Sequence, residues 1–157
     1  MLATAITMGT FGVADERWST ASAELMVESA HLSPDGLTAS IGIPPDKSWS
    51  ADDFRGPRSP ILHKRNGVLY RSTHQAAVSM DEALDELERR MAPVMSKVAE
   101  LNKNLRSDEG EVRVCLLLTL TTNQGETGLR LRAHTLDFWR QADVPIDISV
   151  MVIQDKP

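Results

Sequence analysis

The sequence of 157 residues contains little cysteine, few aromatic residues and no long apolar run. With Cys115 as the single cysteine, an intrachain disulfide is excluded, which is typical of proteins from the reducing cytoplasm. No apolar run reaches the roughly 18 residues of a membrane helix, so we expect no membrane association. Residues 1–18 carry no Lys or Arg before their apolar stretch, unlike a signal peptide. We therefore expect a cytoplasmic protein with an N-terminal extension, 1–18, and a single domain, 19–157.

Positive charge is also scarce, because 17 Lys and Arg oppose 22 Asp and Glu and give a net charge of -5. This balance disfavours a nucleic-acid partner, whose phosphates would need neutralising, and is compatible with a basic protein partner. Only 4% of the residues are aromatic, which leaves little for base stacking. The local basic segment "RGPRSPILHKR" is better explained as a solvated or protein-contacting loop.

Three segments alternate apolar and polar residues with the period of a β-strand: residues 19–29, 110–122 and 144–153. In the last one we expect Ile146, Ile148, Val150 and Val152 to point inward. Asn66-Gly67, the strongest short hairpin signal, predicts two further strands near 61–65 and 68–73. Residues 44–60 are rich in Pro, Asp, Ser and Gly, which predicts a loop.

Helical segments separate these strands. Ser33 is placed to cap a short helix that Gly42 ends. Ser79 begins a long apolar stripe at helical spacing, and Pro93 predicts a kink or break within it. A last helix is predicted near 131–142. The order β-α-β-β-α-β-α-β predicts an α+β fold of ferredoxin-like flavour, with a mainly antiparallel sheet and helices packed on one face.

Several of these stretches, taken together, resemble a small uncharacterised bacterial family. The resemblance is carried by "LSPDGLTASIGIPPDKSW", Gly56, "VLYRSTH", "ALDELERRMAPVMSKVAEL" and "LDFWRQADVPIDISVMV". The family is known as domain of unknown function family 4279. The resemblance covers roughly residues 19–153 and implies a compact α+β domain, and it brings no catalytic residues.

Chemistry-bearing residues are sparse. Cys115 lies mid-strand among leucines, so an inert, partly buried thiol is predicted. The four histidines lack the i, i+4 spacing of a metal-binding helix, and we predict no metal and no cofactor. An enzyme that uses His63 or His74 with a nearby carboxylate is a minor alternative. The acidic residues of "DEALDELE" are explained by the dipole at a helix start.

Two features favour a protein partner. The loop 44–60 carries Trp49, Phe54 and Arg55, and Trp and Arg frequently anchor interfaces, although Trp49 could instead cover the core. The outer sheet face, opposite the helices, would expose apolar side chains among charges. The residues of this strip are Met26, Leu117, Met151 and Ile153, with Glu24, Glu28, Arg113 and Asp147 around them. The N-terminal extension or a homodimer mate could equally cover it.

The leading hypothesis is therefore a non-enzymatic protein-binding domain, most concretely an immunity- or antitoxin-type protein that neutralises a bacterial toxin. The alternative is a small-molecule-binding regulatory domain, with a pocket between the helical stripe and the sheet.

Overall fold

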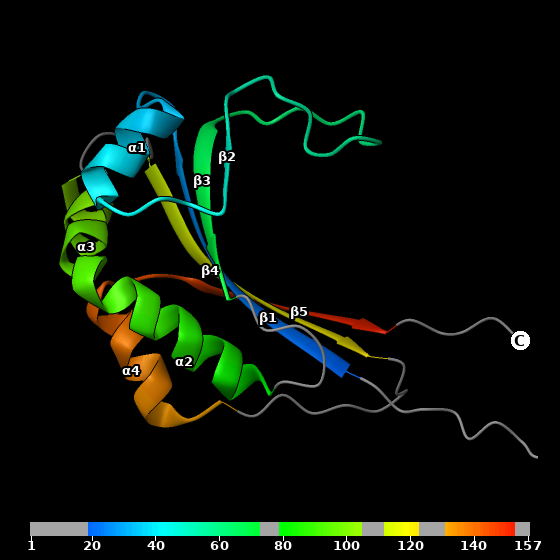
Figure 1. Cartoon of the computed structure of the whole chain (residues 1–157), viewed down its shortest axis with the longest axis vertical. Helices are drawn as coiled ribbons and strands as arrows, with labels where there is room; N and C mark the ends of the chain where they lie inside the picture. The colour runs from blue at the N-terminus through cyan, green and yellow to red at the C-terminus, as the bar shows by residue number, and fades with distance from the viewer. Residues whose placement is uncertain (1–18, 73–78, 105–111, 123–130, 153–157) are drawn as a thin grey trace, which may run out of the picture.

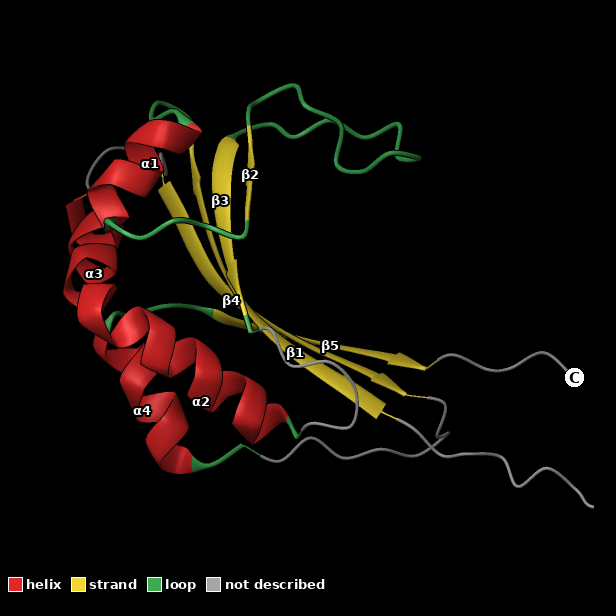
Figure 2. Cartoon of the chain, viewed as in Figure 1, coloured by secondary structure: helices red, strands yellow, loops and turns green. Residues whose placement is uncertain are grey.

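The computed structural model describes residues 19–72, 79–104, 112–122 and 131–152. These residues form a five-stranded sheet of order β2-β3-β1-β4-β5, drawn in Figures 1 and 2. Every neighbouring pair is antiparallel except β4 and β5, which are parallel. The strands are β1 (Ser19–Ser29), β2 (Lys47–Trp49), β3 (Asn66–Arg71), β4 (Val112–Thr122) and β5 (Ile146–Val152).

The helices all pack on one face of this sheet (Figure 2), so the predicted α+β class with a mainly antiparallel sheet is confirmed. Helix α1 lies over β3, α2 over β1 and α3 over β4. The helical elements are α1 (Pro34–Ile41), α2 (Met80–Met91), the 3-10 turn η1 (Ala92–Val94), α3 (Met95–Asn104) and α4 (Ala133–Gln141).

The core lies between β1 and the helices. Leu25 and Val27 on β1 are fully buried, as are Leu84, Leu87 and Met91 on α2. Full burial of one such side chain stabilises the fold by about 1.5–3 kcal/mol. The apolar face of β1 and the apolar stripe of α2 therefore pack against each other, as the strand and helix periods predict.

Local signals place the helix ends correctly. The Ser33 hydroxyl accepts from the Gly36 N–H, and Gly42 ends α1 in the left-handed conformation with φ 92°. The Ser79 hydroxyl accepts from the Glu82 N–H at the start of α2. The predicted break at Pro93 is also confirmed, because α2 ends at Met91 and α3 begins only after the turn η1.

The predicted hairpin at Asn66-Gly67 is wrong. Residues 61–65 are not a strand, and Asn66 and Gly67 begin β3 without the positive φ of a hairpin turn. β3 pairs with β1 on one side. The strand on its other side is β2, which lies within the predicted loop 44–60. Gly67 serves a different purpose, since the Trp49 ring occupies the space that a Cβ there would need.

The expected inward direction of β5 is only partly right. Its register puts Ile148 level with Leu118 and Val150 level with Leu120, on the helix side of the sheet. Ile146 is half-buried, yet Ile148, Val150 and Val152 are 54%, 48% and 44% exposed. The reason is that the helices lie over β3, β1 and β4, so the helical layer stops short of β5.

Some sequence expectations fall outside the described residues, namely the N-terminal extension 1–18, His74 and Ile153. Within the described part of the chain, no helix has the length and apolar character needed to cross a membrane.

Substituting Gly67 tests this packing. A Cβ at Gly67 would lie 2.1 Å from the Trp49 ring. We therefore expect Gly67→Ala to lower the free energy of unfolding by about 1–3 kcal/mol, the usual cost of overpacking. A Cβ at Gly56 would meet nothing within 4 Å, so Gly56→Ala should change stability by less than about 0.5 kcal/mol. Urea denaturation followed by tryptophan fluorescence measures both, and equal stabilities would contradict the placement of Trp49.

Candidate functional site

A folded loop, residues 50–65, connects β2 to β3 and projects away from the helical layer (Figure 1). We call it the arm. The Asp52 N–H donates to the His63 carbonyl and the His63 N–H donates to the Asp53 carbonyl, both at 2.8 Å. Further out, the Arg55 N–H donates to the Ile61 carbonyl at 2.9 Å. Phe54 and Leu62 form an isolated β-bridge between the two sides. The arm is therefore held by its own backbone hydrogen bonds.

Trp49 and Asn66 fasten the base of the arm to the sheet. The Trp49 ring lies against Gly67 and stacks on His63, with 4.7 Å between ring centroids. The Asn66 side-chain oxygen accepts from the Ala51 N–H at 2.8 Å. Its side-chain nitrogen donates to the Leu32 carbonyl at 3.0 Å. These contacts link both ends of the arm to the body of the domain.

The arm exposes apolar side chains next to basic ones. Phe54 is 66% exposed, Ile61 55% and Leu62 40%. The arm contains four basic and two acidic residues, so its net charge is +2 although the whole chain carries -5. The basic residues are Arg55, Arg58, Lys64 and Arg65, and the acidic ones are Asp52 and Asp53. An ordered, exposed aromatic side chain among arginines has the composition of an interface anchor.

Trp49 takes the buried one of the two positions that the sequence allowed. Its side chain is 6% exposed and lies beneath the arm, so the structure decides between the two options that the sequence left open. Phe54 and Arg55 are on the exposed arm, where the sequence placed them. Ile61 and Leu62 were missed as candidate residues because residues 61–65 were assigned to a strand. Pro57 and Pro60, just before that segment, were the available signal against a paired strand there.

The outer face brings only part of its predicted strip together. Met26 pairs with Leu69 on β3 and with Cys115 on β4, while Leu117 is a diagonal neighbour beside Cys115 on the same strand. Met26 and Leu117 are both half-buried. Met151, 49% exposed, is opposite Thr121, which is four residues further along β4 than Leu117. Arg113 is exposed at the other end of the strip, opposite Glu28. The predicted strip is therefore not one continuous apolar patch.

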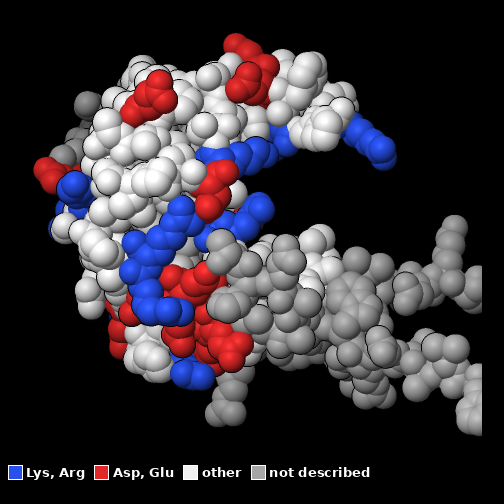
Figure 3. Space-filling view, in the orientation of Figure 1, with Lys and Arg blue, Asp and Glu red and all other residues white. Residues whose placement is uncertain are grey.

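The arm overhangs this outer face. Trp49 pairs with Gly67, and Gly67 pairs with Glu28, so the base of the arm lies on the outer side of the sheet. Figure 3 shows a hollow beneath the arm, with Lys and Arg side chains along its upper wall. A surface of this shape can enclose a projecting part of another molecule.

The described residues do not assemble a nucleophilic or metal centre. Burial, followed by a 3.1 Å hydrogen bond that the thiol donates to Asp147, raises the pKa of Cys115 to about 12. Cys115 is 2% exposed, so it is more deeply buried than the partly buried thiol expected from the sequence, and nucleophilic chemistry needs an ionised, accessible thiolate. Burial, together with Arg55 and Lys47, lowers the pKa of His63, which keeps its ring neutral against Trp49. No metal-ligating group of three or more His, Cys, Asp or Glu occurs within the described ranges.

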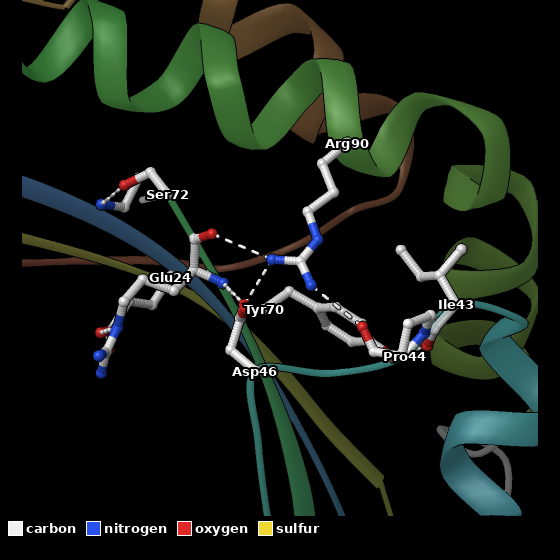
Figure 4. A network of polar contacts seen from close by, with 9 residues as sticks. Glu24, Ile43, Pro44, Asp46, Tyr70, Ser72 and Arg90 are labelled. Atoms are coloured by element: carbon white, nitrogen blue, oxygen red, sulfur yellow. Dashed lines mark hydrogen bonds and ion pairs between the residues drawn. The ribbon is translucent and has the colours of Figure 1, made fainter. Parts of the chain in front are cut away.

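A polar cluster surrounds Arg90 beneath α2 (Figure 4). The Arg90 guanidinium donates to the Asp46 carboxylate and to the carbonyls of Pro44 and Arg71. It also lies over the Tyr70 ring, 5.4 Å from the centroid. The Tyr70 hydroxyl donates to the Ile43 carbonyl, and burial raises the pKa of Tyr70 to about 12. These donors bind one carboxylate and three backbone carbonyls of the same chain, so the cluster fastens the segment before β2 to α2 and β3.

A surface hollow of about 340 Å³ lies between α1 and α3 and is lined by Ser40, Lys97, Glu100 and Leu101. The small-molecule hypothesis placed its pocket elsewhere, between the helical stripe and the sheet. There the fully buried side chains of β1 and α2 fill the space.

The Arg90 cluster yields a stability prediction. Arg90→Lys keeps the charge but loses the planar fork that reaches three acceptors, so we expect it to lower the free energy of unfolding by about 1 kcal/mol. Arg89 is the matched control, because it donates to the Asp85 carbonyl one turn earlier in the same helix. Arg89→Lys should leave stability unchanged. Thermal unfolding of both variants checks this, and equal melting temperatures would argue against the cluster as a fastening point.

Comparison with known proteins places the chain in a family. No curated protein and no solved structure matches the chain. One family model does match, and it covers residues 19–152, from the first residue of β1 to the last residue of β5. The chain therefore belongs to the family described as domain of unknown function (DUF4279).

Proposed function

We propose that this domain is a non-enzymatic protein-binding module that recognises its partner through the arm. The observation that carries the proposal is Phe54, 66% exposed on a loop whose backbone is already hydrogen bonded. A large apolar side chain held in this way loses little conformational freedom on binding, which favours affinity. Interface energy is usually concentrated in a few such residues.

The charge of the arm suggests the chemistry of the partner's surface. Arg55 and Arg58 lie between Phe54 and Ile61 in the sequence, on an arm of net charge +2. The complementary surface is an apolar pocket bordered by carboxylates. The chain as a whole carries -5, so a partner that is basic overall would still be attracted over longer distances.

An immunity- or antitoxin-type protein is the concrete form of this role that we propose. Such a protein acts by covering a toxin's functional surface and needs no catalytic centre of its own. The underside of the arm, where Figure 3 shows Lys and Arg side chains, is suited to contacting a protruding segment of the partner. Buried Cys115, with its raised pKa, lacks the accessible thiolate that a nucleophilic mechanism at this residue would need, which favours a binding role.

A small-molecule-binding regulatory role is the second candidate. The hollow of about 340 Å³ between α1 and α3 supports it, because this volume falls within the range of ligand pockets. Three of its four lining residues, Ser40, Lys97 and Glu100, are exposed, so the hollow is open to solvent, whereas most ligand pockets bury the greater part of their ligand. The arm is therefore the stronger candidate.

Affinity capture with matched variants tests the proposal. Tagged protein is used to capture partners from lysate of its own source cells, and the affinity for the retained protein is then measured by titration. Phe54→Ser should weaken binding roughly 30-fold, the equivalent of about 2 kcal/mol for an anchor residue. Met151→Ser is the control, since Met151 is also about half exposed but lies on the outer face of β5.

Retained affinity in Phe54→Ser together with a loss in Met151→Ser would move the site to the outer face. Capture of no specific protein by the unmodified chain would contradict a protein-binding role. If the captured protein is toxic when expressed alone and harmless when expressed with this chain, the immunity-type role is supported. If the captured protein is harmless alone, that role is rejected.

A further inference from the structure

The two edges of the sheet are built differently. At one edge, β2 has three residues, includes the charged Lys47 and is followed by the arm. At the other, β5 has seven residues, and its only charged residue is Asp147. Proteins usually protect edge strands from pairing by keeping them short or charged. The β5 edge is more than twice as long as β2, and the Asp147 carboxylate accepts a hydrogen bond from the Cys115 thiol on β4, so in the part of the chain that the structure describes this edge is the less protected one.

We propose that two copies of this chain associate through β5, which pairs antiparallel with β5 of the second copy across a two-fold axis. This pairing would join the two sheets into one continuous sheet. It lies at the edge opposite the arm, so it is independent of the protein-binding role proposed above. Both arms of the dimer remain available to partners.

Alternate residues of β5 direct their backbone N–H and C=O groups away from β4, toward the open edge. The Leu116 N–H donates to the Pro145 carbonyl, and the parallel ladder with β4 continues from there. Successive residues of a strand direct their N–H and C=O groups to opposite sides. Pro145, Asp147, Ser149 and Met151 therefore face β4, whereas Ile146, Ile148, Val150 and Val152 direct their backbone groups away from the sheet. These are the groups that an antiparallel neighbour would bind.

A single register pairs the whole strand. When Ser149 faces Ser149 of the second copy, Ile148 faces Val150 and Ile146 faces Val152, each pair occurring twice. These pairs join residues whose backbone groups point outward, so each can form both of its hydrogen bonds. Two-fold registers centred on Ile148 or Val150 leave the ends of β5 unpaired.

The side chains and the charge also fit this register. On the helix side, the exposed Ile148, Val150 and Val152 of each copy meet apolar side chains of the other, which removes them from water. On the outer side, Asp147 faces Met151, so the two copies place no like charges directly opposite each other. This self-complementarity favours a second copy over an unrelated strand.

Sedimentation analysis of the full chain at micromolar concentrations tests the association. The unmodified chain should have about twice the mass of one chain, and Val150→Lys should have the mass of one. Met151→Lys is the matched control, because the same charge would then face Asp147 of the second copy, and the dimer should persist. A monomeric unmodified chain, or a Val150→Lys variant that remains dimeric, would overturn the proposal.

Disulfide cross-linking tests the register without disturbing the apolar pairs. In a Cys115→Ser background, Ser149→Cys should cross-link on mild oxidation. A non-hydrogen-bonded antiparallel pair has its Cα atoms about 4.5 Å apart, within disulfide range. Met151→Cys in the same background should not cross-link, because the two cysteines would be separated by four residues along the paired strands. Cross-linking of Met151→Cys in place of Ser149→Cys would overturn the proposed pairing.

Discussion

The contact between the Trp49 ring and the bare backbone of Gly67 supports the most distinctive part of this molecule. The ring is 6% exposed and covers the start of β3, and His63 stacks on it from the returning side of the arm. One side chain thus joins the end of β2, the start of β3 and the arm. Because a side chain at position 67 would occupy the same space, this arrangement requires glycine. The arm can then expose Phe54 without being held by a partner.

The two edges of the sheet have different properties. The helical layer lies over β3, β1 and β4, which gives the domain its core. One edge is extended by the arm, whose basic and apolar side chains are suited to a different protein. The other edge, β5, has exposed apolar residues and a self-complementary order of side chains. The proposed partner recognition and the proposed self-association would therefore use separate edges of the sheet.

Much of this fold could be predicted from the sequence because its signals are local. The alternation in β1, the Ser33 and Ser79 caps, the Gly42 stop and the Pro93 break each depend on neighbouring residues. Asn66-Gly67 has two possible meanings, a tight turn or a close approach, and the distant Trp49 decides between them. The exposure of Ile148 could not be predicted either. Alternation indicates which face of the sheet a side chain lies on, and it does not indicate whether a helix covers that face. Within the candidate site, Phe54 and Arg55 could be found by residue type, whereas Ile61 and Leu62 required the observed path of the arm.

Recognition through the arm requires that the arm be a folded element before it meets a partner. Amide hydrogen exchange of the isolated protein, measured by NMR, tests this directly at Asp52, Arg55 and His63, whose N–H groups donate within the arm. We expect these amides to exchange far more slowly than they would in an unstructured peptide. Exchange at the unstructured rate at all three positions would contradict a folded arm, because Phe54 would then lie on a loop with no fixed conformation.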